Sequence, residues 1–236
     1  MKTLKRAIEQ LGIAASEETL SKFKEYMERV LSWNEKVNLT TITEETDFIK
    51  KHLIDSILCI GFVEIRNAES IIDIGTGAGF PGVPLALVFP NKQFLLLDST
   101  EKKIKILRDI TEKLEIKNIK LIHARAEDLA HREEHREKYD ACVSRAVANL
   151  SILSEYCLPF VKTGGSFVSY KGPDAEEEVK AAETAVKTLG GELAGIRKIE
   201  LDGFDLDHSF VVIKKINNTP DKYPRKAGIP EREPLL

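Results

Sequence analysis

The sequence has few of the features that mark metal-binding, secreted or membrane-spanning proteins. It contains only three cysteines in 236 residues, Cys59, Cys142 and Cys157, and they form no C-x-x-C pair. Zinc and thiol redox sites usually need paired cysteines, so we expect no metal site and three reduced, buried thiols. No apolar run approaches the roughly 20 residues that cross a membrane, and the polar start MKTLKRAIEQ is unlike a signal peptide. We therefore expect a cytoplasmic protein with no membrane partner.

The sequence also lacks an overall positive charge. Its net charge is -3 at pH 7, whereas proteins that attract nucleic acid over a whole surface are strongly basic. Any RNA contact must therefore be local, and we expect either an RNA-binding or a solvated role for the C-terminal tail, where basic residues are in excess. The charged residues there are Lys214, Lys215, Lys222, Arg225, Lys226 and Arg232, against Asp221, Glu231 and Glu233.

Hydrophobic residues make up 42% of the chain, enough for one large domain with a smaller appendage. Up to residue 63 the apolar spacing is helical and indicates an N-terminal helical cap. From Ser70 onward, short apolar runs alternate with amphipathic stretches, which is typical of βαβ units and a mainly parallel sheet. We predict an α/β domain over 64–217 that ends in an antiparallel hairpin, 193–201 with 208–216, followed by a basic tail over 218–236. The other predicted strands are 71–74, 94–97, 119–122, 141–143 and 166–170.

A glycine-rich loop follows the first predicted strand. Gly75, Gly77 and Gly79 form G-x-G-x-G, while Gly77, Gly79 and Gly82 also match the dinucleotide pattern G-x-G-x-x-G. Glycines let the backbone turn tightly and approach a ligand without side-chain clashes. The spacing alone leaves S-adenosylmethionine and a nicotinamide dinucleotide as alternatives.

Two residues of this loop favour S-adenosylmethionine. Asp73 puts negative charge where a pyrophosphate would lie, and Pro81 has no N–H to offer a phosphate. Asp98, at the end of the second strand, is placed to accept hydrogen bonds from ribose hydroxyls in either cofactor. After the third strand, Ala126 and Glu127 either contact an adenine base or simply begin a helix.

The end of the fourth strand carries a cation but no recognisable catalytic group. Cys142 lies within an apolar strand, where a thiol is inert, so a cytosine-C5 mechanism is not expected. Arg145 suits a guanine edge, a phosphate or an ion pair. Lys171, after the fifth strand, either adds a second cation to this rim or ends the strand without a function.

These motifs together resemble the bacterial 16S ribosomal RNA guanine-N7 methyltransferases, also called glucose-inhibited division protein B. The resemblance covers nearly the whole chain, through Trp33-Asn34-x-x-x-Asn38-Leu39-Thr40, His52-x-x-Asp55-Ser56, Asp73-x-Gly75-Thr76-Gly77-x-Gly79-Phe80-Pro81-Gly82, Leu97-Asp98-Ser99, Arg125-Ala126-Glu127, Ser144-Arg145-Ala146, Lys171-Gly172 and Tyr223-Pro224-Arg225-Lys226-x-Gly228-x-Pro230.

The resemblance implies a class I, Rossmann-like methyltransferase with a mostly parallel seven-stranded sheet. Its reaction would move a methyl group from S-adenosylmethionine to N7 of one guanine in the decoding-region loop of 16S rRNA. The family motifs imply cofactor contacts from Gly75, Phe80, Ala126, Glu127 and Arg145. The expected partner is therefore 16S rRNA or the small ribosomal subunit, not DNA, and we expect a monomer.

Guanine N7 carries a lone pair and no proton, so methyl transfer needs no general base and depends on positioning. We assign positioning roles to Asn38, His52 and Arg145. Substrate contacts are expected from Asn34, Asp55, Lys171, Arg225 and Lys226. The polar residues of the cap either orient the base or form a structural network that joins cap to core.

Two alternatives from other classes remain at this point. The overlapping glycine pattern together with Asp98 permits an NAD-dependent oxidoreductase. A non-catalytic ribosome-binding module that keeps the methyltransferase fold is the other, because a fold does not dictate a function.

Overall fold

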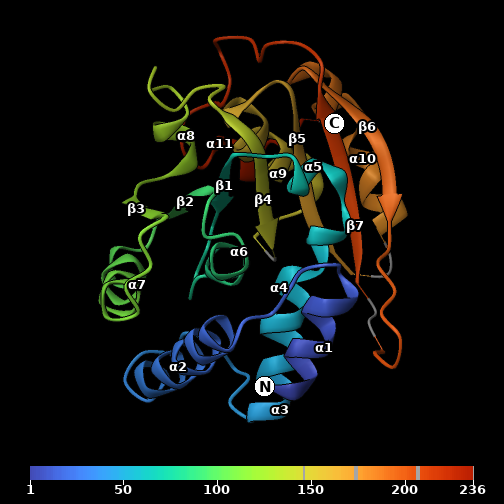
Figure 1. The fold of residues 1–236 in the computed structure, drawn as a ribbon. Coiled ribbons are helices and arrows are strands. Elements are labelled where there is room, and N and C mark those ends of the chain that lie inside the picture. The colour runs from blue at the N-terminus through green and yellow to red at the C-terminus, as the bar shows by residue number, and fades with distance from the viewer. Residues whose placement is uncertain (146, 173–174, 206–207, 236) are drawn as a thin grey trace.

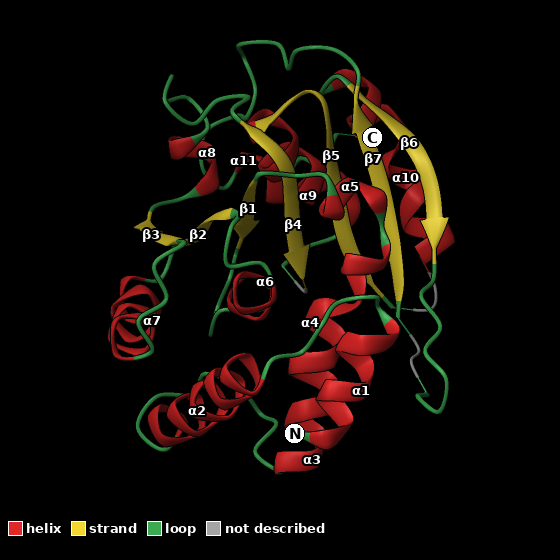
Figure 2. Ribbon diagram, viewed as in Figure 1, coloured by secondary structure: helices red, strands yellow, loops and turns green. Residues whose placement is uncertain are grey.

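The computed structural model describes residues 1–145, 147–172, 175–205 and 208–235 and has one seven-stranded sheet between helical layers (Figures 1 and 2). The strand order is β3-β2-β1-β4-β5-β7-β6. Strands β1 to β5 pair in parallel, and β7 is antiparallel to both β5 and β6. The predicted α/β class and the C-terminal antiparallel hairpin are confirmed.

The elements follow the alternation of the sequence. The strands are β1 (Ser70–Ile74), β2 (Gln93–Asp98), β3 (Ile119–His123), β4 (Tyr139–Arg145), β5 (Val161–Lys171), β6 (Gly191–Arg197) and β7 (Ser209–Lys215). The helices after β1 are α6 (Gly82–Val88), α7 (Glu101–Lys113), α8 (Ala126–Leu129), α9 (Leu150–Cys157), α10 (Ala175–Thr188) and α11 (Ile229–Arg232), with a 3-10 turn over Leu158–Phe160. The cap consists of α1 (Lys2–Gln10), α2 (Glu17–Asn34), α3 (Glu45–Phe48), a π-helical segment (Ile49–Ile54), α4 (Asp55–Ile57), a 3-10 turn (Leu58–Gly61) and α5 (Val63–Arg66).

The inner strands β1, β2, β4, β5 and β7 bury most of their residues on both faces, as strands covered by helices on each side do, whereas the edge strands β3 and β6 are partly exposed. Successive residues alternate between two hydrophobic clusters, because side chains of a strand point to opposite faces. Ile71 and Val143 join the cluster that contains the cap, whereas Ile72 and Cys142 join the cluster under α9 and α10. The thiol of Cys142 is buried, and this burial raises its pKa well above the usual value, as expected for an inert cysteine.

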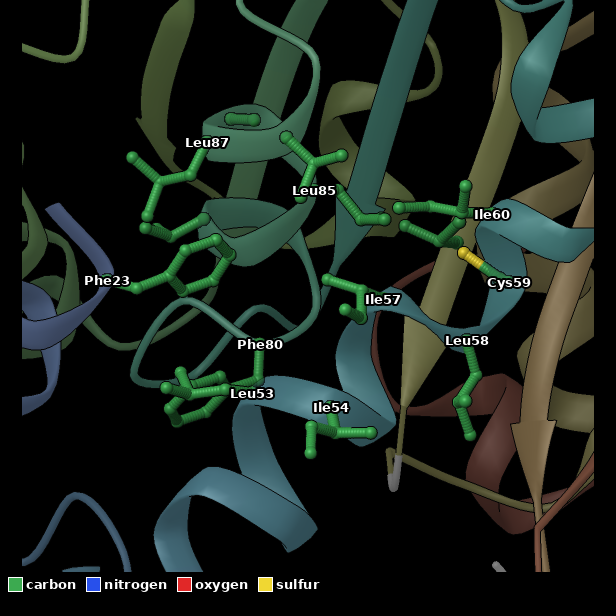
Figure 3. Packing of buried hydrophobic residues seen from close by; sticks show 14 of the residues in the cluster. Phe23, Leu53, Ile54, Ile57, Leu58, Cys59, Ile60, Phe80, Leu85 and Leu87 are labelled. Atoms are coloured by element: carbon green, nitrogen blue, oxygen red, sulfur yellow. The ribbon is translucent and has the colours of Figure 1, made fainter. Parts of the chain in front are cut away.

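The cap shares its hydrophobic cluster with one face of the sheet. Figure 3 shows Phe23 of α2 and Leu53 of the π-helical segment converging on Phe80 and on Leu85 of α6. Helix α2 begins after Ser16, whose hydroxyl accepts from the backbone N–H of Thr19 at 3.0 Å. The cap is thus packed directly against the layer that carries the glycine loop.

The connection between β6 and β7 differs from the predicted tight hairpin. Strand β6 ends at Arg197 rather than at residue 201, and β7 begins only at Ser209. The intervening chain binds to the cap instead of the sheet: Gln10 donates to the Asp202 carbonyl at 3.1 Å and accepts from the Asp202 N–H at 2.7 Å. The backbone groups of Asp202 and the carbonyl of Gly203 are thus satisfied by side chains of α1 rather than by a neighbouring strand.

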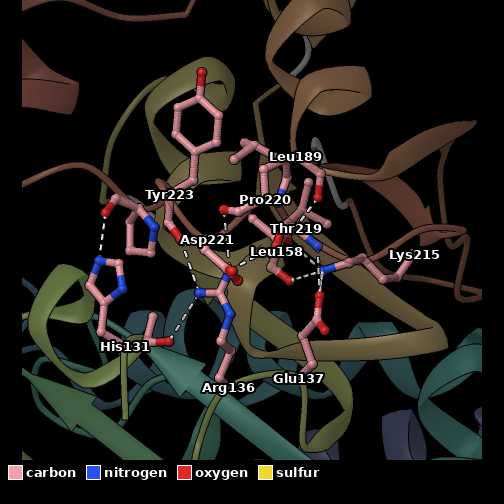
Figure 4. A network of polar contacts seen from close by, with 12 residues as sticks. His131, Arg136, Glu137, Leu158, Leu189, Lys215, Thr219, Pro220, Asp221 and Tyr223 are labelled. Carbon is pink, nitrogen blue, oxygen red and sulfur yellow. Dashed lines mark hydrogen bonds and ion pairs between the residues drawn. The ribbon is translucent and has the colours of Figure 1, made fainter. Parts of the chain in front are cut away.

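The C-terminal tail is docked onto the domain. Figure 4 shows Arg136 donating to the backbone oxygens of Thr219 and Tyr223, at 2.8 and 2.9 Å. Lys215, which is fully buried, donates to the Thr219 hydroxyl at 2.6 Å and lies 3.0 Å from the carboxylate of Glu137. Arg136, on the segment before β4, and Lys215, at the end of β7, therefore hold the start of the tail in place.

The three cysteines are buried and unpaired, as predicted. Within the described ranges no helix combines the length and the apolar composition that a bilayer-crossing helix needs.

Candidate functional site

The glycine loop turns over the ends of β1 and β2. The N–H groups of Gly75 and Thr76 both donate to the Leu97 carbonyl, at 2.8 and 3.0 Å. Gly75 and Gly77 have φ angles of +74° and +61°, a region that side-chain-bearing residues rarely adopt. A Cβ at Gly79 would lie 2.7 Å from the Tyr26 hydroxyl, so this glycine allows the loop to pack against α2.

Asp73 organises this loop from within the protein. Its Oδ2 accepts from the Thr76 hydroxyl at 2.7 Å and from the Gly82 N–H at 2.9 Å, which fixes the start of α6. Burial raises the pKa of Asp73 to about 7, although Thr76 and Gly82 oppose the shift. Its second oxygen, Oδ1, is buried and has no hydrogen-bond partner among the residues that the structure describes. The predicted ligand residue therefore also shapes the loop.

A pocket with a volume of about 120 Å³ opens beside the loop. Asp98 lies at its edge and accepts from the N–H groups of Gly77 and Thr100, at 2.9 and 2.8 Å. These bonds use two of about four lone-pair positions on the carboxylate, so the others remain for a ligand. The pocket is lined by Ile74, Gly75, Leu97, Asp98, Ser99, Ala124, Arg125, Ala126, Glu127, Val147, Tyr156 and Glu231.

Carboxylates outnumber cations in this lining, with Asp98, Glu127 and Glu231 against Arg125. Such a field opposes a pyrophosphate and favours a ligand that carries a sulfonium and an ammonium group. The residues present therefore fit S-adenosylmethionine better than a dinucleotide.

The predicted residues after β3 lie in the same pocket. Ala126 and Glu127 form the first turn of α8, and both are buried. The Glu127 carboxylate accepts from the N–H of Gly228, in the tail, at 3.3 Å. Tyr156 and Glu231 also line the pocket, and sequence reasoning missed both. Glu231 reaches the pocket only because the tail docks onto the domain, and Tyr156 lies within the largely apolar helix α9, so neither local pattern carries a ligand signal.

A second polar cluster surrounds Arg145, at the end of β4. Its Nη1 donates to Asp55 Oδ2 at 2.5 Å and to the Lys51 carbonyl at 3.0 Å. Its Nη2 donates to His52 Nδ1 at 3.2 Å, and the guanidinium carbon lies 5.1 Å from the centre of the Phe80 ring. The structure thus brings together the His52–Asp55 motif, Phe80 and Arg145, which lie on three separate segments of the sequence.

His52 is held in one tautomer by this cluster. Nδ1 accepts from Arg145, so the proton lies on Nε2 and is donated to the Thr40 hydroxyl at 2.6 Å. Burial and the nearby Arg145 lower the pKa of His52 to about 4. The neutral ring stacks on Phe80 with a centroid distance of 4.4 Å and an interplanar angle of 11°. Phe80 is itself buried between the loop and the cap.

The remaining predicted residues divide into paired and exposed side chains. Asn34 ends α2, and its Oδ1 accepts from the N–H groups of Leu39 and Thr40 at 2.7 and 2.9 Å. Asn38, in the loop so formed, is exposed. Asn34 therefore shapes the loop that presents Asn38.

Lys171 is buried rather than free on the rim. Its Nζ donates to the Ala148 carbonyl at 3.1 Å and to Glu178 at 2.5 Å, which fixes the segment between β4 and α9. Arg225 forms a bidentate pair with Glu155, whereas Lys226 is exposed. Of the predicted substrate-binding cations, Lys226 is the one whose side chain faces solvent.

The strand order, the glycine loop and the acidic pocket define the class I S-adenosylmethionine-dependent methyltransferase fold. Solved structures agree at the level of the fold. An O-methyltransferase from Bacillus cereus in complex with SAH has a TM-score of 0.57 at 17% identity, covering 80% of this chain and 90% of that one. M. jannaschii TYW2 in complex with AdoMet has a TM-score of 0.55 at 16% identity, covering 75% and 80%.

Sequence comparison identifies the family. Residues 19–202 match the family described as rRNA small subunit methyltransferase G, and the chain belongs to it. Ribosomal RNA small subunit methyltransferase G of Clostridium novyi is 49% identical over 230 residues, covering 98% of this chain and 95% of the relative. The protein of the same name from Clostridium tetani is 47% identical over 232 residues, covering 98% and 97%. The chain is thus an S-adenosylmethionine-dependent methyltransferase, and the oxidoreductase alternative is not supported.

Proposed function

We propose that this chain transfers the methyl group of S-adenosylmethionine to N7 of a single guanine in 16S rRNA, by direct in-line displacement. Given that the chain belongs to this family, one observation supports the proposal most directly. The loop at Gly75, where φ is positive, and the carboxylate of Asp98, which has lone pairs left for a ligand, border the same acidic pocket. The pocket lies where the ends of β1, β2 and β3 meet, the usual ligand position in open α/β sheets.

The cofactor would be held along this pocket by four groups. Gly75 and Gly77 present backbone at its methionine end, and Asp98 offers free lone pairs to the ribose hydroxyls. Ala126 and Glu127 stand beside the adenine. Asp73 acts from behind the loop, by bonding Thr76 and the start of α6.

The bound cofactor supplies a methyl group on a sulfonium, which the lone pair of N7 accepts as the carbon–sulfur bond breaks. No protein group has to remove a proton, so the residues of this chain act by position and by electrostatics. The purine becomes cationic, and an unpaired cation beside N7 would oppose this change. The charge of Arg145 is offset by Asp55. Arg145 can therefore lie close to the acceptor base without opposing the positive charge that develops there.

Arg145 retains hydrogen-bonding capacity toward a ligand. Of its five N–H groups, three are used, by Asp55, Lys51 and His52, so two remain. We assign these two to the cofactor carboxylate, a phosphate or O6 of the guanine. His52 and Asp55 are positioning residues that act through Arg145. Asn38 is exposed on the loop whose Thr40 bonds His52, and it is assigned to the base.

The acceptor is 16S rRNA, either naked or within the small subunit, and the protein acts as a cytoplasmic monomer on RNA rather than DNA. The division into a cap of 1–63, a methyltransferase domain of 64–217 and a tail of 218–236 is proposed with it. Lys226 supplies an exposed tail cation for RNA.

The direct test is incubation with labelled S-adenosylmethionine and small subunits that lack N7-methylguanine, followed by nucleoside mass spectrometry. We expect N7-methylguanosine at one position. Asp98→Ala should abolish transfer together with S-adenosylhomocysteine binding, whereas Asp128→Asn, an exposed acid on the neighbouring turn, should retain both. Cofactor binding without transfer to subunits or to naked 16S rRNA would overturn the assigned acceptor.

A further inference from the structure

The last short helix of the chain, α11, forms part of the wall of the cofactor pocket. Glu231 of this helix lines the pocket together with Tyr156, and their side-chain oxygens lie 3.4 Å apart. The other lining residues come from positions 74–147. The pocket wall is thus formed by residues at the strand ends together with a residue of the C-terminal tail.

The tail is fixed at this place by a buried ion pair. The side chain of Glu155 is only 1% exposed and receives the Arg225 guanidinium through Oε1 at 3.0 Å and Oε2 at 2.7 Å. The backbone N–H of Arg225 also donates to Glu155, at 2.7 Å. Because Glu155 is so deeply buried, loss of its partner would leave an uncompensated charge inside the protein. The ion pair therefore holds Arg225, and with it the residues that follow in the tail, beside Glu155.

A second contact sets which end of the pocket Glu231 borders. The N–H of Gly228, three residues before Glu231, donates to the carboxylate of Glu127. Glu127 begins the turn after β3, whereas Gly75 and Val147 line the part of the pocket beside the glycine loop. Glu231 therefore borders the part of the pocket formed after β3.

The inference rests on the proposed function, which puts ribose at Asp98 and the adenine beyond it, beside Glu127. We propose that Glu231 accepts a hydrogen bond from the exocyclic amine of the adenine and is a specificity-determining residue for the cofactor. An ionised carboxylate only accepts hydrogen bonds. It pairs with the 6-amino group of adenine and repels the 6-oxo group of hypoxanthine, which is an acceptor. Tyr156 holds the carboxylate in place.

The test compares two ligands that differ only at purine position 6, S-adenosyl-L-homocysteine and S-inosyl-L-homocysteine, by isothermal titration calorimetry. The natural protein should prefer the adenosyl ligand. Glu231→Gln should reduce this preference by roughly tenfold or more, because an amide can donate to the 6-oxo group and loses the charge-assisted bond. Glu231 is exposed, so the variant should fold with an unchanged melting temperature.

Glu233→Gln is the matched control, since Glu233 is exposed on the same tail and lies outside the pocket lining. It makes the same change of charge and should keep the preference of the natural protein. An unchanged preference in Glu231→Gln would overturn the inference while leaving the proposed function intact. Failure of the natural protein to bind either ligand would instead overturn the proposed cofactor site.

Discussion

Arg145, the last residue of β4, donates a hydrogen bond of 2.5 Å to the carboxylate of Asp55, the first residue of α4. Asp55 is 2% exposed, so the pair joins the sheet to the cap inside the protein. His208 Nδ1 lies 3.0 Å from the other carboxylate oxygen. The arginine that the family motifs connect with the cofactor is thus positioned by the N-terminal segment.

Asp55→Asn should destabilise the protein, because the amide keeps the shape but leaves the guanidinium without its counter-charge. Breaking a buried pair costs about 3–5 kcal/mol, and we expect about 3 kcal/mol since Asn still accepts one hydrogen bond. Urea unfolding measures the change. Asp47→Asn removes a surface partner of Lys51 at 2.8 Å and should leave the urea unfolding curve nearly unchanged, because exposed ion pairs contribute little to stability. Equal effects of the two substitutions would show that the Arg145 pair has no special role.

The neutral state of His52 predicts a pH dependence with a definite sign. Its folded pKa of about 4 lies below the ordinary 6.5, so the unfolded chain binds more protons between these values. Stability is therefore lost as the pH falls from 6.5 toward 4, by at most about 3 kcal/mol and by less because the ring is partly exposed. Asp73, whose pKa burial raises to about 7, contributes with the opposite sign.

Because the two groups oppose one another, the measurement is the difference in unfolding free energy between the natural protein and His52→Gln at pH 7 and pH 5. The difference should shrink at pH 5. NMR titration of the His52 ring provides a direct check, with a midpoint near pH 4 expected. A midpoint near 6.5 would refute the buried, neutral assignment.

The sequence predicted much of the fold because hydrophobic periodicity is a local property. The strand runs, the Ser16 cap and the glycine loop all depend on residues within a few positions of one another. The role of Glu231 depends on a tail that folds back over 70 residues to Glu155. Likewise, the ion pair of Asp55 with Arg145 joins residues 90 positions apart. Long-range pairs of this kind leave no periodic signal.

Asn34 and Asn38 provide a matched pair for separating structure from function. Asn34→Ala removes two backbone hydrogen bonds and should lower the free energy of unfolding by about 1–2 kcal/mol. Asn38→Ala changes an exposed side chain and should leave stability within about 0.5 kcal/mol. If Asn38 orients the base, its substitution lowers methyl transfer at unchanged S-adenosylhomocysteine affinity. Parallel loss of stability and activity would assign it a structural role.

Gly75 and Gly77 should respond differently to alanine although both have positive φ angles. A Cβ at Gly75 would lie 2.5 Å from a methyl group of Val147, whereas at Gly77 it would meet only a backbone oxygen at 4.0 Å. Gly77→Ala should therefore cost about 1–2 kcal/mol of backbone strain. Gly75→Ala adds the displacement of Val147, which lines the pocket. Calorimetry should show the larger loss of S-adenosylhomocysteine affinity for Gly75→Ala, and equal losses would mean that Val147 moves without cost.

Arg225 and Lys226 are adjacent cations in the tail, and the structure predicts different effects when each is replaced by alanine. Arg225→Ala leaves the buried carboxylate of Glu155 without its partner, so we expect a loss of about 3 kcal/mol in unfolding free energy and weaker S-adenosylhomocysteine binding as the tail loosens. Lys226→Ala alters an exposed side chain and should change stability by less than about 0.5 kcal/mol. If Lys226 contacts RNA, its substitution weakens binding to 16S rRNA and lowers the salt dependence of that binding, because one fewer phosphate is neutralised. If the salt dependence of 16S rRNA binding is unchanged in Lys226→Ala, Lys226 does not contact RNA, and the tail acts only at the cofactor pocket.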